Sequence, residues 1–145
     1  MSLAIEADLI RRVPVFSAIE PAKQKLLCFS SERLTFEPGQ VMFREGDAPD
    51  AAYVLIAGTV EITVQAPGGP VLVNTLGESD VVGETAIFGD VPRTATATAK
   101  TRIEALRVSK DLFLDLVRDN AEAAMQISRI LATRLANTTA QLSAA

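Results

Sequence analysis

The feature that most constrains the fold is a series of short strand patterns that runs from about Leu34 to Val108. Val41 and Phe43 are spaced two residues apart, and apolar and polar residues alternate over 60–64. Residues 53–56 are an unbroken apolar run. Alternation is typical of a strand with one buried face, and a short apolar run is typical of a more fully buried strand. Turn signals separate the runs, at Gly39, Gly46, Gly58 and the APGGP segment. Several short strands joined by turns predict a β-sandwich or barrel.

Helical patterns flank this central region. Residues 3–12 and 21–28 are predicted to be helices, and Pro21 is well placed at a helix start. From Ser109 onwards the period becomes helical again, and Ser109 can cap the first of two C-terminal helices. Asn120 can cap the second. We therefore expect a mainly β chain with helices at both ends.

Length and composition indicate one ordinary globular domain over 1–145, with a helical element at 1–30, a β-barrel at 31–108 and C-terminal helices at 109–145. Apolar residues make up 48% and charged residues 22% of the chain. No apolar run is long enough to span a bilayer, and no signal-peptide pattern opens the chain. Cys28 is the only cysteine, so an intrachain disulfide is impossible and a cytoplasmic location is expected.

The most specific chemistry lies between residues 83 and 94. Gly83 allows close approach of a ligand, and the residues after it can form one helical turn with free N–H groups, which suit an anion. Arg93 adds a planar fork of donors suited to phosphate, and Thr94 adds a hydroxyl beside it. Glu84 would repel phosphate and should accept hydrogen bonds from sugar hydroxyls. A ribose joined to a phosphate satisfies both requirements.

The run VVGETAIFGDVPRTATA, at 81–97, resembles the phosphate-binding cassette of cyclic-nucleotide-binding domains, often written F-G-E-x-A-L-x-x-x-x-P-R-x-A. The matching positions are Gly83, Glu84, Ala86, Pro92, Arg93 and Ala95. Upstream, PGQVMFREGDAPDAAYVLIAGTVEI is similar to the family's glycine-punctuated strand pattern, although Ser79 stands where the family usually has glycine. The resemblance implies a jelly-roll barrel, also called a double-stranded β-helix, with the cassette at 82–95.

The resemblance also assigns roles within the cassette. It implies that Glu84 binds the ribose 2′-hydroxyl and that Arg93 binds the cyclic phosphate. Backbone amides at Gly83, Thr85 and Ala86, together with Thr94, would complete the pocket.

The C-terminal helix carries an apolar stripe at Ile127, Leu131, Leu135 and Leu142. This stripe either packs on the chain's own barrel or forms a dimer seam. The segment LATRLANTTAQL also resembles the dimerisation helix of catabolite-activator-type members of the family. In those members a Thr-Ser pair, matched here by Thr138 and Thr139, hydrogen-bonds the purine from two subunits.

Several function classes fit poorly. The chain has no histidine, so a metal-binding cupin or a histidine-assisted nucleophile is excluded, and Glu84 has no obvious second acid in the cassette. We expect a binding module that is not an enzyme and holds no metal. The net charge of −4, with scattered basic residues, argues against nucleic-acid binding. The end of the chain at Ala145 leaves no room for a helix-turn-helix, so direct DNA binding is not expected.

The sequence therefore predicts a cyclic-nucleotide sensor that signals by repacking of its C-terminal helices, with no membrane partner. Thr94 beside the arginine occurs in relatives that favour cyclic GMP, while Thr138 and Thr139 favour cyclic AMP, which is the preferred ligand here. Expected partners are a second copy through the last helix and a downstream protein or fused output domain. The alternative is a divergent domain of the same fold that binds another anion, or nothing, and acts through protein contacts.

Overall fold

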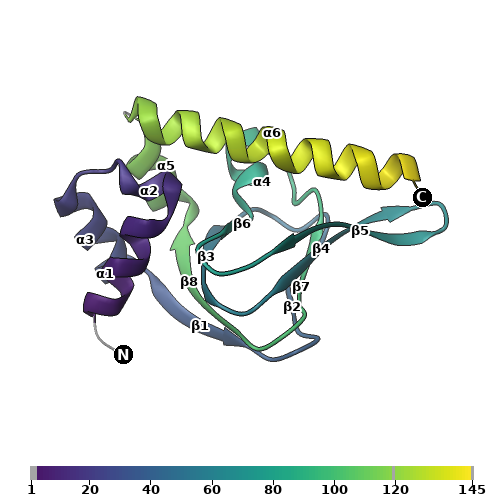
Figure 1. Ribbon diagram of the computed structural model, residues 1–145, viewed down its shortest axis with the longest axis horizontal. Coiled ribbons are helices and arrows are strands. Elements are labelled where there is room, and N and C mark those ends of the chain that lie inside the picture. The colour runs from purple at the N-terminus through teal and green to yellow at the C-terminus, as the bar shows by residue number, and fades with distance from the viewer. Residues whose placement is uncertain (1–2, 119, 145) are drawn as a thin grey trace.

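The computed structural model describes residues 3–118 and 120–144 of the chain. Three helices come first, and the strands follow with one short helix inserted before β7 (Figure 1). Two further helices end the described chain. The helices are α1 (Leu3–Arg12), α2 (Pro14–Ser17), α3 (Pro21–Ser30), α4 (Glu84–Gly89), α5 (Lys110–Arg118) and α6 (Ala121–Ala144). The strands are β1 (Glu32–Phe36), β2 (Val41–Phe43), β3 (Ala51–Ala57), β4 (Val60–Ala66), β5 (Gly69–Leu76), β6 (Val81–Val82), β7 (Thr96–Ala99) and β8 (Ile103–Ser109).

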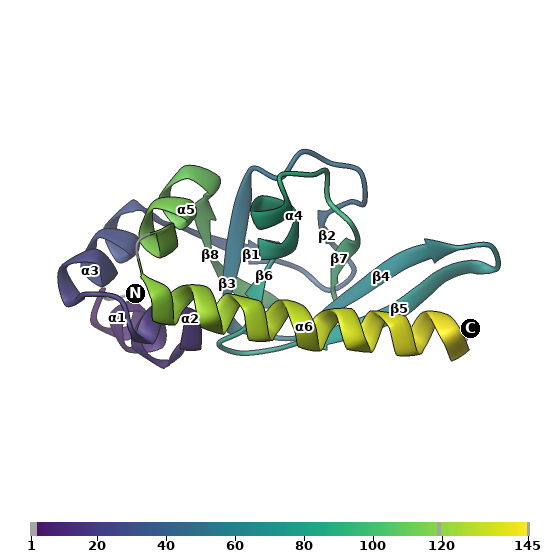
Figure 2. The same ribbon diagram turned by 90° about the horizontal axis from the view of Figure 1, so that it is seen from above.

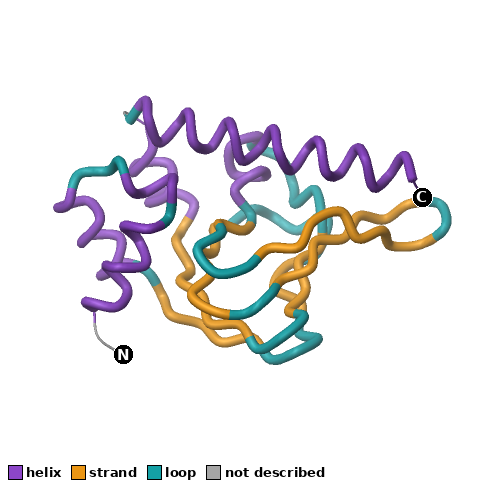
Figure 3. Tube along the Cα trace, viewed as in Figure 1, coloured by secondary structure: helices purple, strands orange, loops and turns teal. Residues whose placement is uncertain are grey.

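The strands form two antiparallel four-stranded sheets, with the orders β1-β8-β3-β6 and β2-β7-β4-β5. Figure 3 shows the helices gathered to one side of these sheets, with α6 running along the molecule towards the β4–β5 hairpin. The prediction of a mainly β chain with flanking helices is confirmed. The finer prediction of a closed jelly-roll barrel stays a prediction, because the described strands form two separate hydrogen-bonded sheets.

Strand β3 shows why the central apolar run is buried along its length. Ala52 and Val54 point into a core shared with the helices, where Phe16 and Phe113 meet edge to face at 5.9 Å between ring centroids. Tyr53, on the opposite face, belongs to the core between the two sheets. Because successive side chains of a strand alternate between faces, a strand covered on both sides must be apolar throughout.

The helix ends agree with the predicted caps. Ser109 Oγ accepts a hydrogen bond from the Leu112 amide at 3.3 Å, and Asn120 Oδ1 accepts one from the Ala123 amide at 2.9 Å. The Asn120 side chain also donates to the Ala18 carbonyl at 3.1 Å, which ties the start of α6 to the end of α2. The sequence did not predict α2 as a helix of its own.

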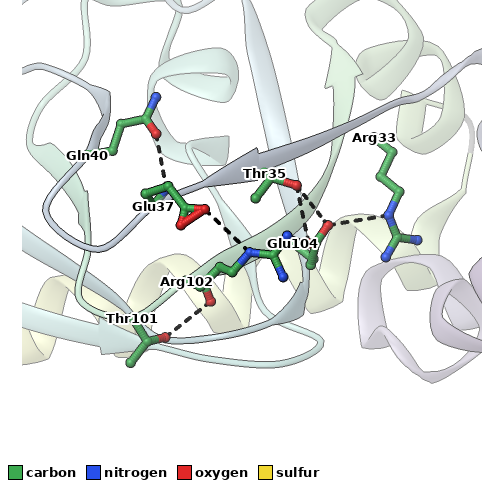
Figure 4. Close-up of polar contacts among 7 residues, drawn as sticks. All are labelled: Arg33, Thr35, Glu37, Gln40, Thr101, Arg102 and Glu104. Atoms are coloured by element: carbon green, nitrogen blue, oxygen red, sulfur yellow. Dashed lines mark hydrogen bonds and ion pairs between the residues drawn. The ribbon is translucent and has the colours of Figure 1, made fainter.

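The β1–β8 pair carries an outward-facing network of charges on the edge of its sheet (Figure 4). Glu104 accepts from the Thr35 hydroxyl and pairs with Arg102 at 3.1 Å and Arg33 at 3.5 Å. Arg102 also pairs with Glu37 at 3.5 Å. The Arg102–Glu37 pair is solvent-exposed, and pairs of that kind contribute little to stability.

Glycines occupy most of the positions with positive φ in the described chain, and Ser79 and Asp90 occupy two more. Gly39, Gly46 and Gly58 have φ angles of 87°, 92° and 100°, in the left-handed region that glycine tolerates. Ser79 also has a positive φ, of 72°, in the turn between β5 and β6. A residue with a Cβ is strained in this left-handed conformation.

Candidate functional site

A cavity of about 590 Å³ lies where the cassette, the β2-β7-β4-β5 sheet and α6 meet. Figure 2 shows α6 crossing the molecule beside α4 and continuing alongside the β4–β5 hairpin. The cassette contributes Gly83, Glu84, Thr85, Ala86, Arg93 and Thr94 to the lining, and α6 contributes Leu131, Arg134, Leu135 and Thr138. Most of the predicted site residues are thus brought together around one hollow.

Gly83 is required by its conformation and by its closeness to Arg93. It precedes α4 with a φ of 92° and a ψ of 8°. A Cβ added at this position would lie 2.5 Å from a terminal nitrogen of Arg93. Any side chain here would therefore strain the backbone and push the guanidinium out of place.

The Arg93 guanidinium is buried and held on several sides, with the residue only 3% exposed. It donates to the Gly83 carbonyl at 2.7 Å and to the Ala51 carbonyl at 2.5 Å. Its central carbon lies 4.0 Å from the centroid of the Phe43 ring, a cation–π contact. These contacts fix the direction in which the guanidinium presents its remaining donors.

Asp50 supports this arginine from the loop before β3. One carboxylate oxygen lies 3.6 Å from Arg93, and the other accepts from Arg107 at 3.2 Å. Burial lowers the pKa of Arg93, and the negative charges around it, that of Asp50 included, act in the opposite direction. Arg93 remains a cation because an arginine is not deprotonated in proteins.

Glu84, at the start of α4, is fully buried. Its Oε1 accepts a hydrogen bond from Arg134, which reaches across from α6. The two charges of this ion pair join the cassette directly to the C-terminal helix. The ion-pair partner of Glu84 is thus Arg134 and not Arg93, the other arginine of the cavity.

Two residues that line this cavity each have a buried side-chain atom with no hydrogen-bond partner among the described residues. The two atoms are Glu84 Oε2, an acceptor, and Arg93 Nε, a donor. Leaving buried polar groups unpaired costs free energy, and such groups are rare in folded proteins. A molecule that carries both a hydroxyl donor and an anionic acceptor has the chemistry to satisfy both atoms.

The four predicted threonines differ in their position relative to the cavity. Thr85 and Thr94 line the cavity but are exposed at its rim, and Thr138 lines it from α6. Thr139 is exposed and lies outside the cavity lining in the described part of the chain. The sequence did not identify Arg134 as a site residue. It stands one helical turn before Thr138, and this i, i+4 spacing on α6 was the signal that could have found it.

Two kinds of site are not found. Within residues 3–118 and 120–144, no cluster of three or more carboxylate, cysteine or histidine groups is placed to hold a metal ion. Over the same residues, no helix combines the length and the apolar character needed to cross a bilayer.

Comparison with known families agrees with this geometry. Residues 33–120 match the family model described as the cyclic nucleotide-binding domain. The chain belongs to the cyclic nucleotide-binding domain family.

The chain is also similar to individual known proteins. The chain is 33% identical, over 90% of its own length, to the CRP-like cAMP-activated global transcriptional regulator of Mycobacterium tuberculosis, and spans 59% of that protein. It is 34% identical, over 74% of its length, to the cAMP-dependent protein kinase regulatory subunit of Yarrowia lipolytica, and spans 28% of that subunit. Among solved structures, the sensor domain of the transcriptional regulator DNR from Pseudomonas aeruginosa superposes with a TM-score of 0.80, at 28% identity. That superposition covers 92% of this chain and 90% of the sensor domain.

Proposed function

We propose that this chain is a single sensor domain, over 1–145, that binds cyclic AMP in the cavity beneath α6. The observation that carries the proposal is that two residues lining one cavity, Glu84 and Arg93, each have a buried polar atom without a partner, Oε2 and Nε. A cyclic nucleotide places a ribose hydroxyl and a phosphate a short distance apart on one rigid frame. Its hydroxyl would donate to Glu84, and its phosphate would accept from Arg93.

The cassette backbone would complete the phosphate contacts. The first N–H groups of a helix have no intrahelical acceptor, which leaves the amides of Thr85 and Ala86 at the start of α4 for phosphate oxygens. The Thr94 hydroxyl, at the rim of the cavity, would add a further donor. Arg93 would supply the full positive charge, held in position by the Gly83 and Ala51 carbonyls.

Cyclic AMP is preferred over cyclic GMP because Thr138 lines the cavity directly from α6. Both curated relatives described above carry cyclic AMP in their names, which favours the same base. Thr94 also faces the cavity and is the feature that favours cyclic GMP. A role for Thr139 requires a second copy of the chain, because this residue lies outside the lining.

The signal would pass through the Glu84–Arg134 ion pair. A ribose hydroxyl on Glu84 Oε2 would share the carboxylate with Arg134, which binds Oε1, so ligand binding and the position of α6 are coupled. A ligand shifts such an equilibrium only by its difference in affinity for the two arrangements. The module would therefore report a nucleotide without transforming it, to a partner protein or to a fused output domain.

A homodimer through α6 is the second part of the proposal. Ile127 is buried against the chain's own core, but Leu135 is 67% exposed and Leu142 is 39% exposed. The apolar stripe is therefore used in its first half and uncovered in its second. Light scattering of the chain at increasing concentration tests this, since a monomer at every concentration would contradict it.

Arg134 also favours the second candidate, a domain of the same fold that takes another anion. With Arg93 and Arg134 on one cavity lining, an anion without a ribose could bind between the arginines and leave the Glu84 pair intact. Such a domain would act through protein contacts. The two candidates differ in whether binding needs the ribose 2′-hydroxyl.

Thermal unfolding in the presence of a ligand panel separates them. A ligand that binds only the folded state raises the midpoint, and at one ligand concentration a tighter ligand raises it further. The proposal predicts a rise with cyclic AMP, a smaller rise with cyclic GMP and little change with 2′-deoxy cyclic AMP. An equal rise with the 2′-deoxy compound or with inorganic phosphate would favour the second candidate.

A further inference from the structure

Strand β5 contains an irregularity that faces the cavity. Its pairing with β4 joins Ile62 to Asn74 and Thr63 to Leu72, so Val73 is an extra residue with no partner of its own. This is a β-bulge, a feature that re-aims side chains and is common beside functional sites. As a result Val73 and Asn74, although adjacent in a strand, are both buried, with exposures of 4% and 9%.

The bulge places a polar side chain in an otherwise apolar part of the cavity. Asn74 lines the same cavity as Ile62, Val64, Leu131 and Leu135. A buried amide among aliphatic side chains is costly unless its donors and acceptors are paired. The hydrogen bonds of Asn74 therefore decide what the residue can do.

The hydrogen bonds of Asn74 differ in length. The Asn74 carbonyl oxygen accepts from the Asn137 side chain at 2.9 Å, an ordinary length that fixes the orientation of the amide. The amide nitrogen faces α6, where it lies 3.4 Å from Thr138 Oγ1 and 3.5 Å from the Arg134 carbonyl. Both distances are at the outer limit for an N–H···O bond. The Asn74 amide nitrogen is thus held in a fixed position but forms only weak hydrogen bonds with α6.

We propose that Asn74 determines the base specificity of this site by donating a hydrogen bond to a purine ring nitrogen, an inference that rests on the proposed function. The aliphatic side chains around it suit the faces of a planar base. Asn74 Nδ2 supplies a donor, and the neighbouring Thr138 Oγ1 can accept from an exocyclic amine. Adenine presents a ring acceptor, N1, next to the amine at position 6. Guanine presents the reverse, a carbonyl at position 6 next to an N1–H donor.

The test compares the dissociation constants of cyclic AMP and cyclic GMP for the unaltered chain and for variants at position 74, measured by calorimetry. Asn74→Ala should weaken cyclic AMP about tenfold, the factor that one hydrogen bond carries, and should leave cyclic GMP within about threefold. Asn74→Asp keeps the size of the side chain but replaces the donor with an acceptor. It should shift the preference towards cyclic GMP, whose N1–H such an acceptor can bind. Thr75→Ala, at the exposed neighbouring position of β5, is the matched control and should leave the ratio of the two constants unchanged.

The outcomes are distinct. If Asn74→Ala weakens both nucleotides by the same factor, or neither, Asn74 only fastens β5 to α6 and the inference is wrong. If Asn74→Asp folds and keeps the original preference, the inference is also wrong. Absence of binding of either nucleotide to the unaltered chain would instead contradict the proposed function itself.

Discussion

Glu84 and Arg134, which are 50 residues apart in the sequence, form an ion pair that joins the cassette to the C-terminal helix. The Glu84 side chain is fully buried and that of Arg134 is 16% exposed. One oxygen of the carboxylate is paired and the other has no partner in the described part of the chain. The Glu84 carboxylate can therefore hold α6 in place through one oxygen and accept a hydrogen bond from a ligand hydroxyl through the other. This carboxylate couples ligand binding to the position of α6.

Removal of Arg134 tests the structural half of that relationship. Arg134→Gln should lower the free energy of unfolding by about 3–5 kcal/mol, because a buried carboxylate loses its charged partner. Arg129→Gln, an exposed arginine on the same helix, is the matched control and should change it by less than about 0.5 kcal/mol. Urea titration measures both values. Equal effects of the two substitutions would show that the pair does not hold α6.

Gly83→Ala should reduce cyclic AMP affinity at least about tenfold, because a Cβ at this position displaces the Arg93 guanidinium. Gly39→Ala is the control, since Gly39 has a similar φ of 87° but open space around it. Both substitutions should lower the unfolding free energy by about 1–2 kcal/mol through backbone strain. Calorimetry should find a loss of affinity for Gly83→Ala alone. Comparable losses in both variants would show that strain, and not the displaced guanidinium, is the cause.

Phe43→Leu should weaken cyclic AMP binding several-fold, in line with the roughly 0.5–2 kcal/mol carried by a cation–π contact. Leucine keeps an apolar side chain beside Arg93 but removes the ring face that orients it. Phe29→Leu changes a ring that is 71% exposed on α3 and should have no effect on binding. Unchanged affinity in Phe43→Leu would mean that the carbonyl contacts alone orient the guanidinium.

Ser79→Gly should raise the free energy of unfolding by about 0.5–1 kcal/mol. Relief of the left-handed conformation outweighs the entropy that glycine adds to the unfolded chain. Ser79→Ala keeps the Cβ and should give no gain. Denaturant unfolding of the two variants separates strain from loss of the hydroxyl, and a gain in both would contradict the role of strain.

The features that the sequence predicted well are those written in local patterns. Gly83 and the turn glycines signal positive φ angles, Ser109 and Asn120 signal helix starts, and the apolar run of β3 signals a strand buried on both faces. Each depends on a few neighbouring residues. Local chemistry of this kind can be read without knowledge of the fold.

The features that the sequence did not reveal depend on contacts between distant segments. Arg134 is an ordinary polar residue of a helix until α6 is placed over Glu84. Asn74 becomes inward-facing only because a bulge interrupts the pairing of β4 and β5, and alternation alone would give Val73 and Asn74 opposite faces. The i, i+4 spacing to Thr138 places Arg134 on one face of α6 but does not reveal its partner Glu84, and an irregularity of register leaves no periodic pattern in the chain.

The most direct test of the account is calorimetric titration of the folded chain with cyclic AMP, alongside Arg93→Ala and Arg93→Lys. We expect the unaltered protein to bind one nucleotide per chain saturably. We also expect a loss of about thirty- to several-thousand-fold in Arg93→Ala, because one member of a buried charge contact is removed. Arg93→Lys should recover part of the loss, since it keeps the charge without the planar fork. No heat of binding from the unaltered protein, or equal affinity in all three, would contradict the central claim.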